Sequence, residues 1–216
     1  MYLAWAAFYE GGTDAMYFDV LIPRLLEDIL AADGIRPVDV PSSPAVKIGR
    51  ETREVNAVAA EICGNRESFH LLFIHADTGG RALQAGIANR REAFAQAATA
   101  LCEWPIIRTA LLSPRHETEA WALADGEAVC RALGFNGRPA ELGLPRTPAA
   151  AERLRDPKEK LNEAARIVSA RGYRNGAAKL LPLIAQEQQI AILRSCPSFQ
   201  DFEASLRDSL VSLGCL

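Results

Sequence analysis

The sequence lacks paired cysteines and long apolar runs, and each absence argues against a class of protein. Its five cysteines stand far apart with no CxxC pair, which argues against a zinc knuckle or a disulfide framework and predicts reduced thiols. No apolar run approaches the roughly 20 residues that cross a bilayer. The start of the chain also shows no basic segment followed by a cleavage pattern. We therefore expect a cytoplasmic protein with no membrane segment.

Motifs for nucleotide cofactors and for triad hydrolysis are missing as well. The glycine pairs Gly11-Gly12 and Gly79-Gly80 belong to neither a P-loop nor a GxGxxG fingerprint. There is no GxSxG elbow, and no serine is placed convincingly with a histidine and an acid. We expect no nucleotide cofactor, so a function must be argued from other side chains.

The composition that is present is that of a globular protein. Apolar residues make up 49% and charged residues 24% of the 216 positions, close to the average for folded domains. Residues 136–148 are rich in glycine and proline, which is typical of a linker or long surface loop. We predict a core over residues 1–145 and a helical extension over 146–216 that packs on it.

Apolar runs alternate with helical patterns along the core. Runs at 3–9, 70–76 and 106–112, with a short fourth at 38–40, predict about four buried strands. In the core, the spacing predicts helices at 14–32, 51–63 and 117–133, and another that follows Gly79-Gly80 and ends near 102. In the extension it predicts helices at 157–170, 178–194 and 198–213. Ser198 is the expected N-cap of the last helix. This order predicts an α/β fold: a central parallel, Rossmann-like sheet flanked by helices.

Three acidic residues follow the predicted strands: Glu10, Asp77 and Glu119. A parallel sheet brings such positions to one edge, where ligands of these folds bind. Carboxylates gathered there repel one another, and a hard divalent cation relieves the repulsion. We therefore predict a Mg²⁺ or Mn²⁺ site, with Asp14 and Asp125 as outer members. The alternative is that each acid is a helix cap, a turn residue or a surface charge.

His75 precedes Asp77 by two residues and points to the same face of the predicted strand. It could ligate a metal, position a water or hydrogen-bond to Asp77. A core histidine satisfied by hydrogen bonds is the equal alternative.

Basic residues are concentrated in the predicted extension. Residues 146–180 hold nine basic and four acidic side chains. Cations of this kind could hold a nucleic-acid backbone beside an acidic site, and the candidates are Arg81, Arg153, Arg155, Lys158 and Lys160. Tyr173 is the stretch's one aromatic residue, so base-specific readout is not expected. A solvated helix face is the alternative explanation.

Two segments resemble Toprim domains. FYEGGTDAMYF at 8–18 is similar to the opening strand that ends on a glutamate, and FIHADTGGR at 73–81 is similar to the second acidic element. By this resemblance Glu10, Asp77 and Glu119 match the acidic positions, whereas His75 stands where the family has the first aspartate of an Asp-x-Asp pair. The resemblance therefore implies a Toprim-like fold with one carboxylate fewer.

Three further segments resemble a family of small bacterial Toprim-like proteins of undefined activity: ETEAWALAD at 117–125, DPKEKL at 156–161 and LRSCPSFQDFEASLR at 193–207. The resemblance implies a partner ATPase in an antiviral defence cluster and favours Lys158 among the cations. We expect Trp121 and Phe199 to be core or interface residues rather than catalytic ones.

Two functions follow as hypotheses. The first is a Mg²⁺-dependent endonuclease that cleaves nucleic-acid phosphodiester bonds, with Glu10, Asp77, Glu119 and His75 in the catalytic site. The second is a catalytically degenerate sensor or structural subunit, motivated by the missing aspartate, which could assemble as an oligomer. Topoisomerase activity is not favoured, because it needs a catalytic tyrosine and large additional domains that this chain is too short to hold. Primase activity is not favoured either, because we find no template and nucleotide sites.

Overall fold

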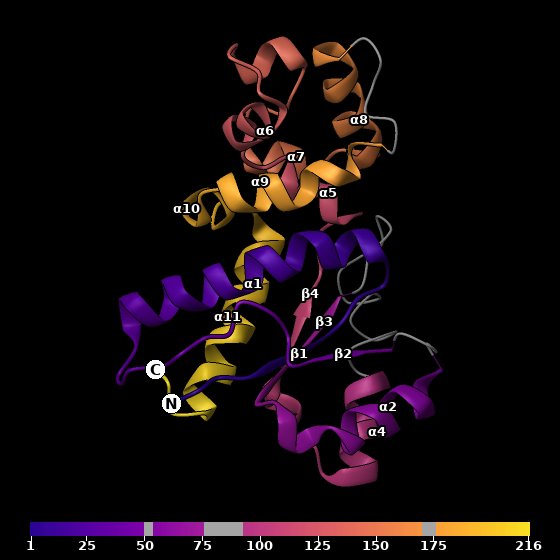
Figure 1. Ribbon diagram of the computed structural model, residues 1–216, viewed down its shortest axis with the longest axis vertical. Coiled ribbons are helices and arrows are strands. Elements are labelled where there is room, and N and C mark those ends of the chain that lie inside the picture. The colour runs from indigo at the N-terminus through magenta and orange to yellow at the C-terminus, as the bar shows by residue number, and fades with distance from the viewer. Residues whose placement is uncertain (50–53, 76–92, 170–175) are drawn as a thin grey trace.

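The computed structural model describes residues 1–49, 54–75, 93–169 and 176–216, and everything below refers to these ranges. They form an α/β fold around an all-parallel sheet (Figure 1). The sheet has four strands in the order β2-β1-β3-β4, with bounds β1 (Trp5–Phe8), β2 (Val46–Ile48), β3 (Leu71–His75) and β4 (Thr109–Leu112). The predicted parallel sheet is confirmed.

The helices surround this sheet. They are α1 (Gly12–Asp33), α2 (Val55–Gly64), α4 (Ala93–Cys102), α5 (Thr118–Ala122), α6 (Gly126–Leu133), α7 (Pro148–Ala151), α8 (Pro157–Val168), α9 (Leu181–Glu187), α10 (Ile190–Leu193) and α11 (Pro197–Ser212). Short 3₁₀ turns are η1 (Arg66–Ser68), η3 (Ile106–Arg108), η4 (Pro139–Leu142) and η5 (Ala177–Leu180). No described helix is long and apolar enough to cross a membrane.

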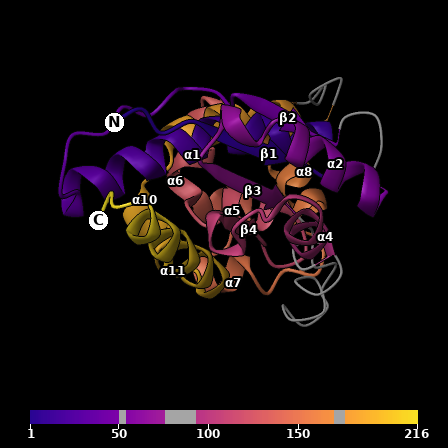
Figure 2. The ribbon, with the colours of Figure 1, turned by 90° about the horizontal axis from the view of Figure 1, so that it is seen from below.

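The strands are buried on both faces because successive side chains alternate between two cores. Trp5 and Phe73 belong to the core on one face, whereas Phe8 and Leu72 belong to the core on the other. The helices α1 and α11 cover the first face, and α2 and α4 cover the second (Figure 2). Ala6 of β1 pairs with Leu72 of β3. This double burial explains why the strands at 3–9 and 70–76 could be recognised as continuous apolar runs.

The structure differs from the prediction in the strand that lies beside β1. The predicted strand at 38–40 is reduced to one bridge between Tyr2 and Asp39, because Pro37 and Pro41 flank it and neither has an amide hydrogen to continue a ladder. The fourth strand is instead β2, in which Val46 and Lys47 are half-buried and Ile48 is buried. Its apolar pattern is too short to be recognised.

The long helix predicted at 117–133 is two helices, α5 and α6. The break lies at Asp125, whose side chain accepts a hydrogen bond from the Ala128 amide at 3.1 Å and so begins α6 as its N-cap. Gly134 ends α6 in the left-handed conformation, as predicted. The predicted helix at 178–194 is similarly divided into η5, α9 and α10.

Ser198 is not the N-cap of α11, which is Cys196. Ser198 instead turns inward, where its amide lies 3.2 Å from Glu152 Oε1 and its hydroxyl donates to the same carboxylate. The indole of Trp121 donates to Ser198 Oγ at 2.8 Å. Ser198 therefore connects α11 to α5 and to the end of α7.

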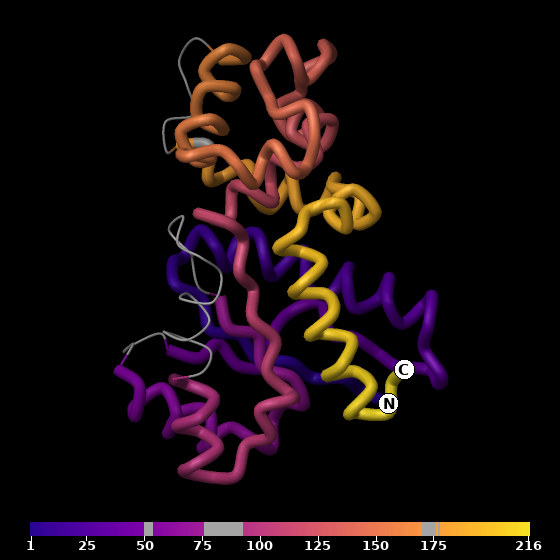
Figure 3. Tube along the Cα trace, turned by 180° about the vertical axis from the view of Figure 1, so that it is seen from behind, coloured from indigo at the N-terminus to yellow at the C-terminus, as the bar shows by residue number. Residues whose placement is uncertain are grey.

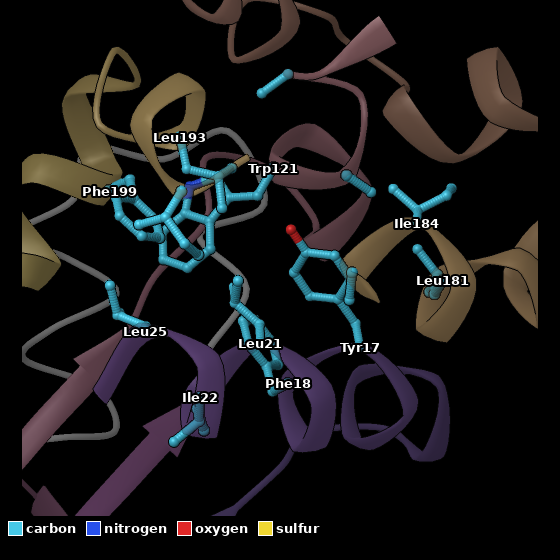
Figure 4. Packing of buried hydrophobic residues seen from close by; sticks show 14 of the residues in the cluster. Tyr17, Phe18, Leu21, Ile22, Leu25, Trp121, Leu181, Ile184, Leu193 and Phe199 are labelled. Atoms are coloured by element: carbon cyan, nitrogen blue, oxygen red, sulfur yellow. The ribbon is translucent and has the colours of Figure 1, made fainter. Parts of the chain in front are cut away.

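One apolar cluster joins the sheet to the helices above it. Tyr17 and Phe18 of α1, Trp121 of α5, Ile184 of α9 and Phe199 of α11 pack together (Figure 4). Figure 3 shows α11 returning from the upper helices along β4, which it contacts. The predicted core and the predicted extension are thus in contact, since α6 of the first also packs on α9 of the second. The boundary between residues 145 and 146 stays a prediction.

Gln188 links these helices by a buried hydrogen-bond network. Its Oε1 accepts from the Tyr17 hydroxyl at 2.6 Å, and its Nε2 donates to the Trp121 carbonyl at 2.6 Å. Arg24 Nη2 donates to the Gln188 carbonyl at 2.8 Å. Because buried polar groups need partners, this network holds α5 in one position against α1.

Cys63 and Cys102 are joined by a disulfide, which corrects the prediction of reduced thiols. The two residues lie near the ends of α2 and α4, which pack closely on each other. Because the two cysteines are 39 residues apart in the sequence, their spacing gave no indication that they lie close together. The other three cysteines, Cys130, Cys196 and Cys215, are free and buried, as expected for small apolar side chains.

Reducing the disulfide should lower the free energy of unfolding by roughly 2–4 kcal/mol, because it releases the closed loop in the unfolded chain. Urea denaturation of the wild type with and without a reductant measures the change, and the double variant Cys63→Ser/Cys102→Ser should match the reduced wild type. Thiol titration of the denatured, unreduced protein should find three free thiols. Five free thiols in protein that was never exposed to a reductant would contradict the bond.

Candidate functional site

The candidate site lies at the carboxyl edge of the sheet, where the chain leaves each strand. Glu10 follows β1 by two residues, His75 is the last residue of β3, and Thr118 and Glu119 begin α5 after β4. The parallel strands bring these positions to the same edge. Asp77 and Arg81, which were predicted to belong here, lie outside the described residues.

Asp14 is buried at this edge, with 7% of its surface exposed. It is in the first turn of α1, where its Oδ2 accepts a hydrogen bond from the Gly11 amide at 2.8 Å. A Cβ atom at position 11 would lie 3.0 Å from the same oxygen, so a larger residue there would push the Asp14 carboxylate from its place. Asp14 therefore both caps α1 and presents a carboxylate to the site.

Thr118 and His75 complete the surroundings of Asp14. The Thr118 hydroxyl donates to Asp14 Oδ1 at 2.7 Å and lies 3.3 Å from His75 Nε2. His75 Nδ1 lies 3.4 Å from Asp14 Oδ2. The His75 ring is fully buried and packs against Phe18 at 5.0 Å between ring centres. The histidine thus contacts the acidic site and the apolar core together.

Burial raises the pKa of the Glu119 carboxyl from its ordinary 4.5 to about 7. Desolvation is the main cause, because only 5% of the residue is exposed. The negative charges of Glu117 and Asp14 raise the pKa further, whereas the positive charge of Lys158 lowers it. The carboxyl is therefore close to half protonated at neutral pH.

The basic side chains that were predicted to hold a nucleic-acid backbone differ in how they contact the acidic residues. Lys158 is the second residue of α8, which packs beside α5, and its amide donates to Glu117 Oε2 at 3.3 Å. Lys160 pairs with Glu163 at 2.8 Å, so its charge is already compensated. Arg153 and Arg155 are exposed just before α8. Lys158 is the cation whose charge is felt at Glu119.

Asp125 is a helix cap, which is the alternative that the sequence analysis left open for each acid. Its two carboxylate oxygens accept hydrogen bonds from the Ala128 and Gln189 amides, each at 3.1 Å. It also lines a separate cavity of about 630 Å³ between α6, η4 and α10. The sequence position of Asp125 suits a helix cap as well as a ligand, and the structure uses it as a cap.

Oxygen ligands for a hard cation are present but incomplete in the described ranges. Asp14 and Glu119 contribute carboxyl groups whose charges interact, and this donor set suits Mg²⁺ or Mn²⁺. Within the same ranges no three histidine, cysteine, aspartate or glutamate side chains gather closely enough to hold a metal. Further oxygens would have to come from Glu10, which is half-buried, or from Asp77.

Thr118 is the site residue that the sequence analysis missed. A threonine next to a glutamate carries no recognisable spacing signal, and its contacts come from α1 and β3, which lie far away in the sequence. The adjoining Glu119 was recognised because carboxylates after strands form a repeated pattern.

We compared the chain with known proteins and found no relative. The α/β architecture with an all-parallel sheet agrees with the coarse fold expected from the sequence. The resemblance to Toprim domains was argued from sequence segments alone and stays an expectation. No protein-family model, curated protein or solved structure matches the chain.

Proposed function

We propose that this protein is a metal-dependent nuclease that cleaves phosphodiester bonds of nucleic acids. One observation carries the proposal: at the carboxyl edge of the sheet, the Glu119 carboxyl has its pKa raised to about 7 by burial and by the nearby charges of Glu117 and Asp14. Buried acids with perturbed pKa values are typical of functional sites. Lys158 beside them supplies a positive charge for a phosphate.

The residues that would hold a divalent cation are Asp14 and Glu119, together with Glu10 and Asp77. Their ligating atoms are oxygens, which Mg²⁺ and Mn²⁺ prefer. A cation held there supplies Lewis-acid activation of water and neutralises charge on the phosphate. This assignment extends the Toprim-like resemblance, in which Glu10, Asp77 and Glu119 occupy the acidic positions.

The chain's own groups support the same chemistry. Without a cation the Glu119 carboxyl can keep its proton near neutral pH, and a bound cation would displace that proton and favour the ligating carboxylate. In the proposed mechanism the general acid or base is therefore Glu10, and His75 supports Asp14 from the core side. Lys158, Arg153 and Arg155 would hold the nucleic-acid backbone next to the acids.

A protein partner is part of the proposal. Residues 1–145 carry more acidic than basic side chains, and nucleic-acid affinity depends on neutralising phosphates. The protein alone is therefore expected to bind its substrate weakly. We propose that a partner ATPase delivers the substrate, as the resemblance to defence-cluster proteins implies.

Purified full-length protein should cleave labelled DNA or tRNA when Mg²⁺ or Mn²⁺ is present and not when the metal is chelated. Cleavage should be assayed with and without any ATPase that co-purifies from the native host. Glu10→Ala and Asp77→Ala should abolish cleavage while leaving the circular dichroism spectrum unchanged. Glu127→Ala, a change at an exposed carboxylate of α6, should cleave like the wild type.

A second function, a catalytically degenerate binding subunit, is favoured by the incomplete set of ligands. Within the described ranges no three histidine, cysteine, aspartate or glutamate side chains gather closely enough to hold a metal, and His75 stands where the resembled family has an aspartate. Such a subunit would show no cleavage even with the ATPase, and Glu10→Ala and Asp77→Ala would keep full biological activity. That pair of results would overturn the nuclease proposal and support this one.

A further inference from the structure

Thr118 is a fully buried threonine at the junction of three elements of the candidate site. It is the first residue of α5, immediately before Glu119. Its side chain reaches Asp14 at the start of α1 and His75 at the end of β3. A threonine at the start of a helix commonly faces solvent or caps its own helix. The Thr118 side chain instead points inward and connects α5 to α1 and β3.

The hydrogen bonds around Asp14 fix the plane of its carboxylate. Thr118 donates to Oδ1 at 2.7 Å and the Gly11 amide donates to Oδ2 at 2.8 Å. Each carboxylate oxygen has further acceptor capacity, so these two bonds orient Asp14 and still allow it to bind a cation. The Gly11 amide belongs to the backbone. Of the two side chains beside Asp14, the Thr118 hydroxyl makes the closer contact, at 2.7 Å from Oδ1, against 3.4 Å between His75 Nδ1 and Oδ2.

We propose that Thr118 is a positioning residue that holds the Asp14 carboxylate in the orientation required for cation binding. This role rests on the proposed function. It also sets the relation between two ligands, because Thr118 is bonded to Asp14 and is covalently next to Glu119. Outer-shell partners of ligating carboxylates act in this manner, and losing one lowers metal affinity by roughly 10–100-fold.

The proposal is tested by titration calorimetry of Mn²⁺ binding to the full-length protein. Thr118→Val keeps the side-chain shape but removes the hydroxyl, so the dissociation constant for Mn²⁺ should rise roughly 10-fold or more. Thr118→Ser keeps the hydroxyl and should bind Mn²⁺ with nearly wild-type affinity. The readout is binding, so it does not depend on cleavage.

Thr109→Val is the matched control. Thr109 is also fully buried, and its hydroxyl accepts one hydrogen bond, from the Trp104 indole at 3.0 Å. It begins β4 and so lies at the opposite edge of the sheet. Thr109→Val should lower the melting temperature and leave the Mn²⁺ affinity unchanged. Equal weakening of Mn²⁺ binding by both valine variants would assign the effect to lost stability and overturn the proposal.

If Thr118→Val does not fold, Thr118→Cys replaces it, because a thiol keeps similar volume and is a weaker donor. Its Mn²⁺ affinity should fall clearly below that of Thr118→Ser. Mn²⁺ binding that is unchanged in the valine or cysteine variant would overturn the role of Thr118 alone. Absence of Mn²⁺ binding by the wild type would overturn the proposed function and this role together, so the two failures are distinguishable.

Discussion

Glu119→Gln should abolish metal-dependent cleavage and at the same time make the folded protein more stable above neutral pH. The amide keeps the size of the side chain but is a poor cation ligand and cannot exchange a proton. A ligand worth about 3 kcal/mol in the transition state corresponds to a rate loss of roughly 100-fold. The gain in stability has a separate cause, which is the burial of the carboxyl.

The pH dependence of this gain follows from the raised pKa of Glu119. Below about pH 4.5 the carboxyl is protonated in both the folded and the unfolded chain, so it has no effect. Between 4.5 and about 7 the unfolded chain releases the proton while the folded chain keeps it, and stability falls as the pH rises. Above that window the loss is constant at about 3 kcal/mol. Glu119→Gln removes this loss.

Urea denaturation at about pH 5 and pH 8 measures the effect, and the advantage of Glu119→Gln over wild type should be larger at the higher pH. Added Mg²⁺ should stabilise the wild type at the higher pH, because a ligand that binds the folded state shifts the equilibrium. It should stabilise Glu119→Gln much less. Glu127→Gln, the same change at an exposed position, should show neither effect. A Glu119→Gln advantage that does not vary with pH would contradict the assigned pKa.

Trp121→Ala should destabilise the protein by roughly 3–5 kcal/mol, the loss expected for a buried large aromatic side chain. The ring is fully buried and packs against Phe18, Phe199 and Phe202 from two other helices. Its indole also donates to Ser198. The change therefore removes apolar contacts and leaves a buried hydroxyl with one partner fewer.

Urea denaturation followed by circular dichroism measures this loss. Trp121→Phe keeps most of the ring volume and loses the indole N–H, so it should cost only about 1–3 kcal/mol. The two values separate packing from hydrogen bonding. A Trp121→Ala variant with wild-type stability but impaired partner binding would instead identify this position as functional, contrary to the assignment of Trp121 to the core.

The sequence pattern was sufficient to predict the strands and helix ends that are determined by neighbouring residues. The strands near 3–9 and 70–76 were predictable because both of their faces are buried, so their apolar runs are continuous. The end of α6 at Gly134 was predictable because a left-handed C-cap favours glycine. The position of Glu119 at the carboxyl edge of the sheet was predictable because parallel strands bring their carboxyl ends to one edge.

Elements that depend on distant partners were not predictable in the same way. The Cys63–Cys102 bond requires α2 and α4 to be packed side by side. The split between α5 and α6 depends on Asp125, which also accepts the amide of Gln189, 64 residues away. Nothing in the local spacing distinguishes Asp125 as a cap from Asp125 as a ligand.

The sequence by itself therefore determined the class of fold and the edge of the sheet at which acids gather. Tertiary structure decided how these side chains are bonded: the carboxylate of Asp14 accepts a hydrogen bond from Thr118, whereas that of Asp125 caps α6. Tertiary structure also joined Thr118 to Asp14 across 104 positions of the chain. The physical reason is that strand burial and helix caps arise from neighbouring residues, whereas a hydrogen bond between α1 and α5 exists only after the sheet has brought both helix starts to one edge.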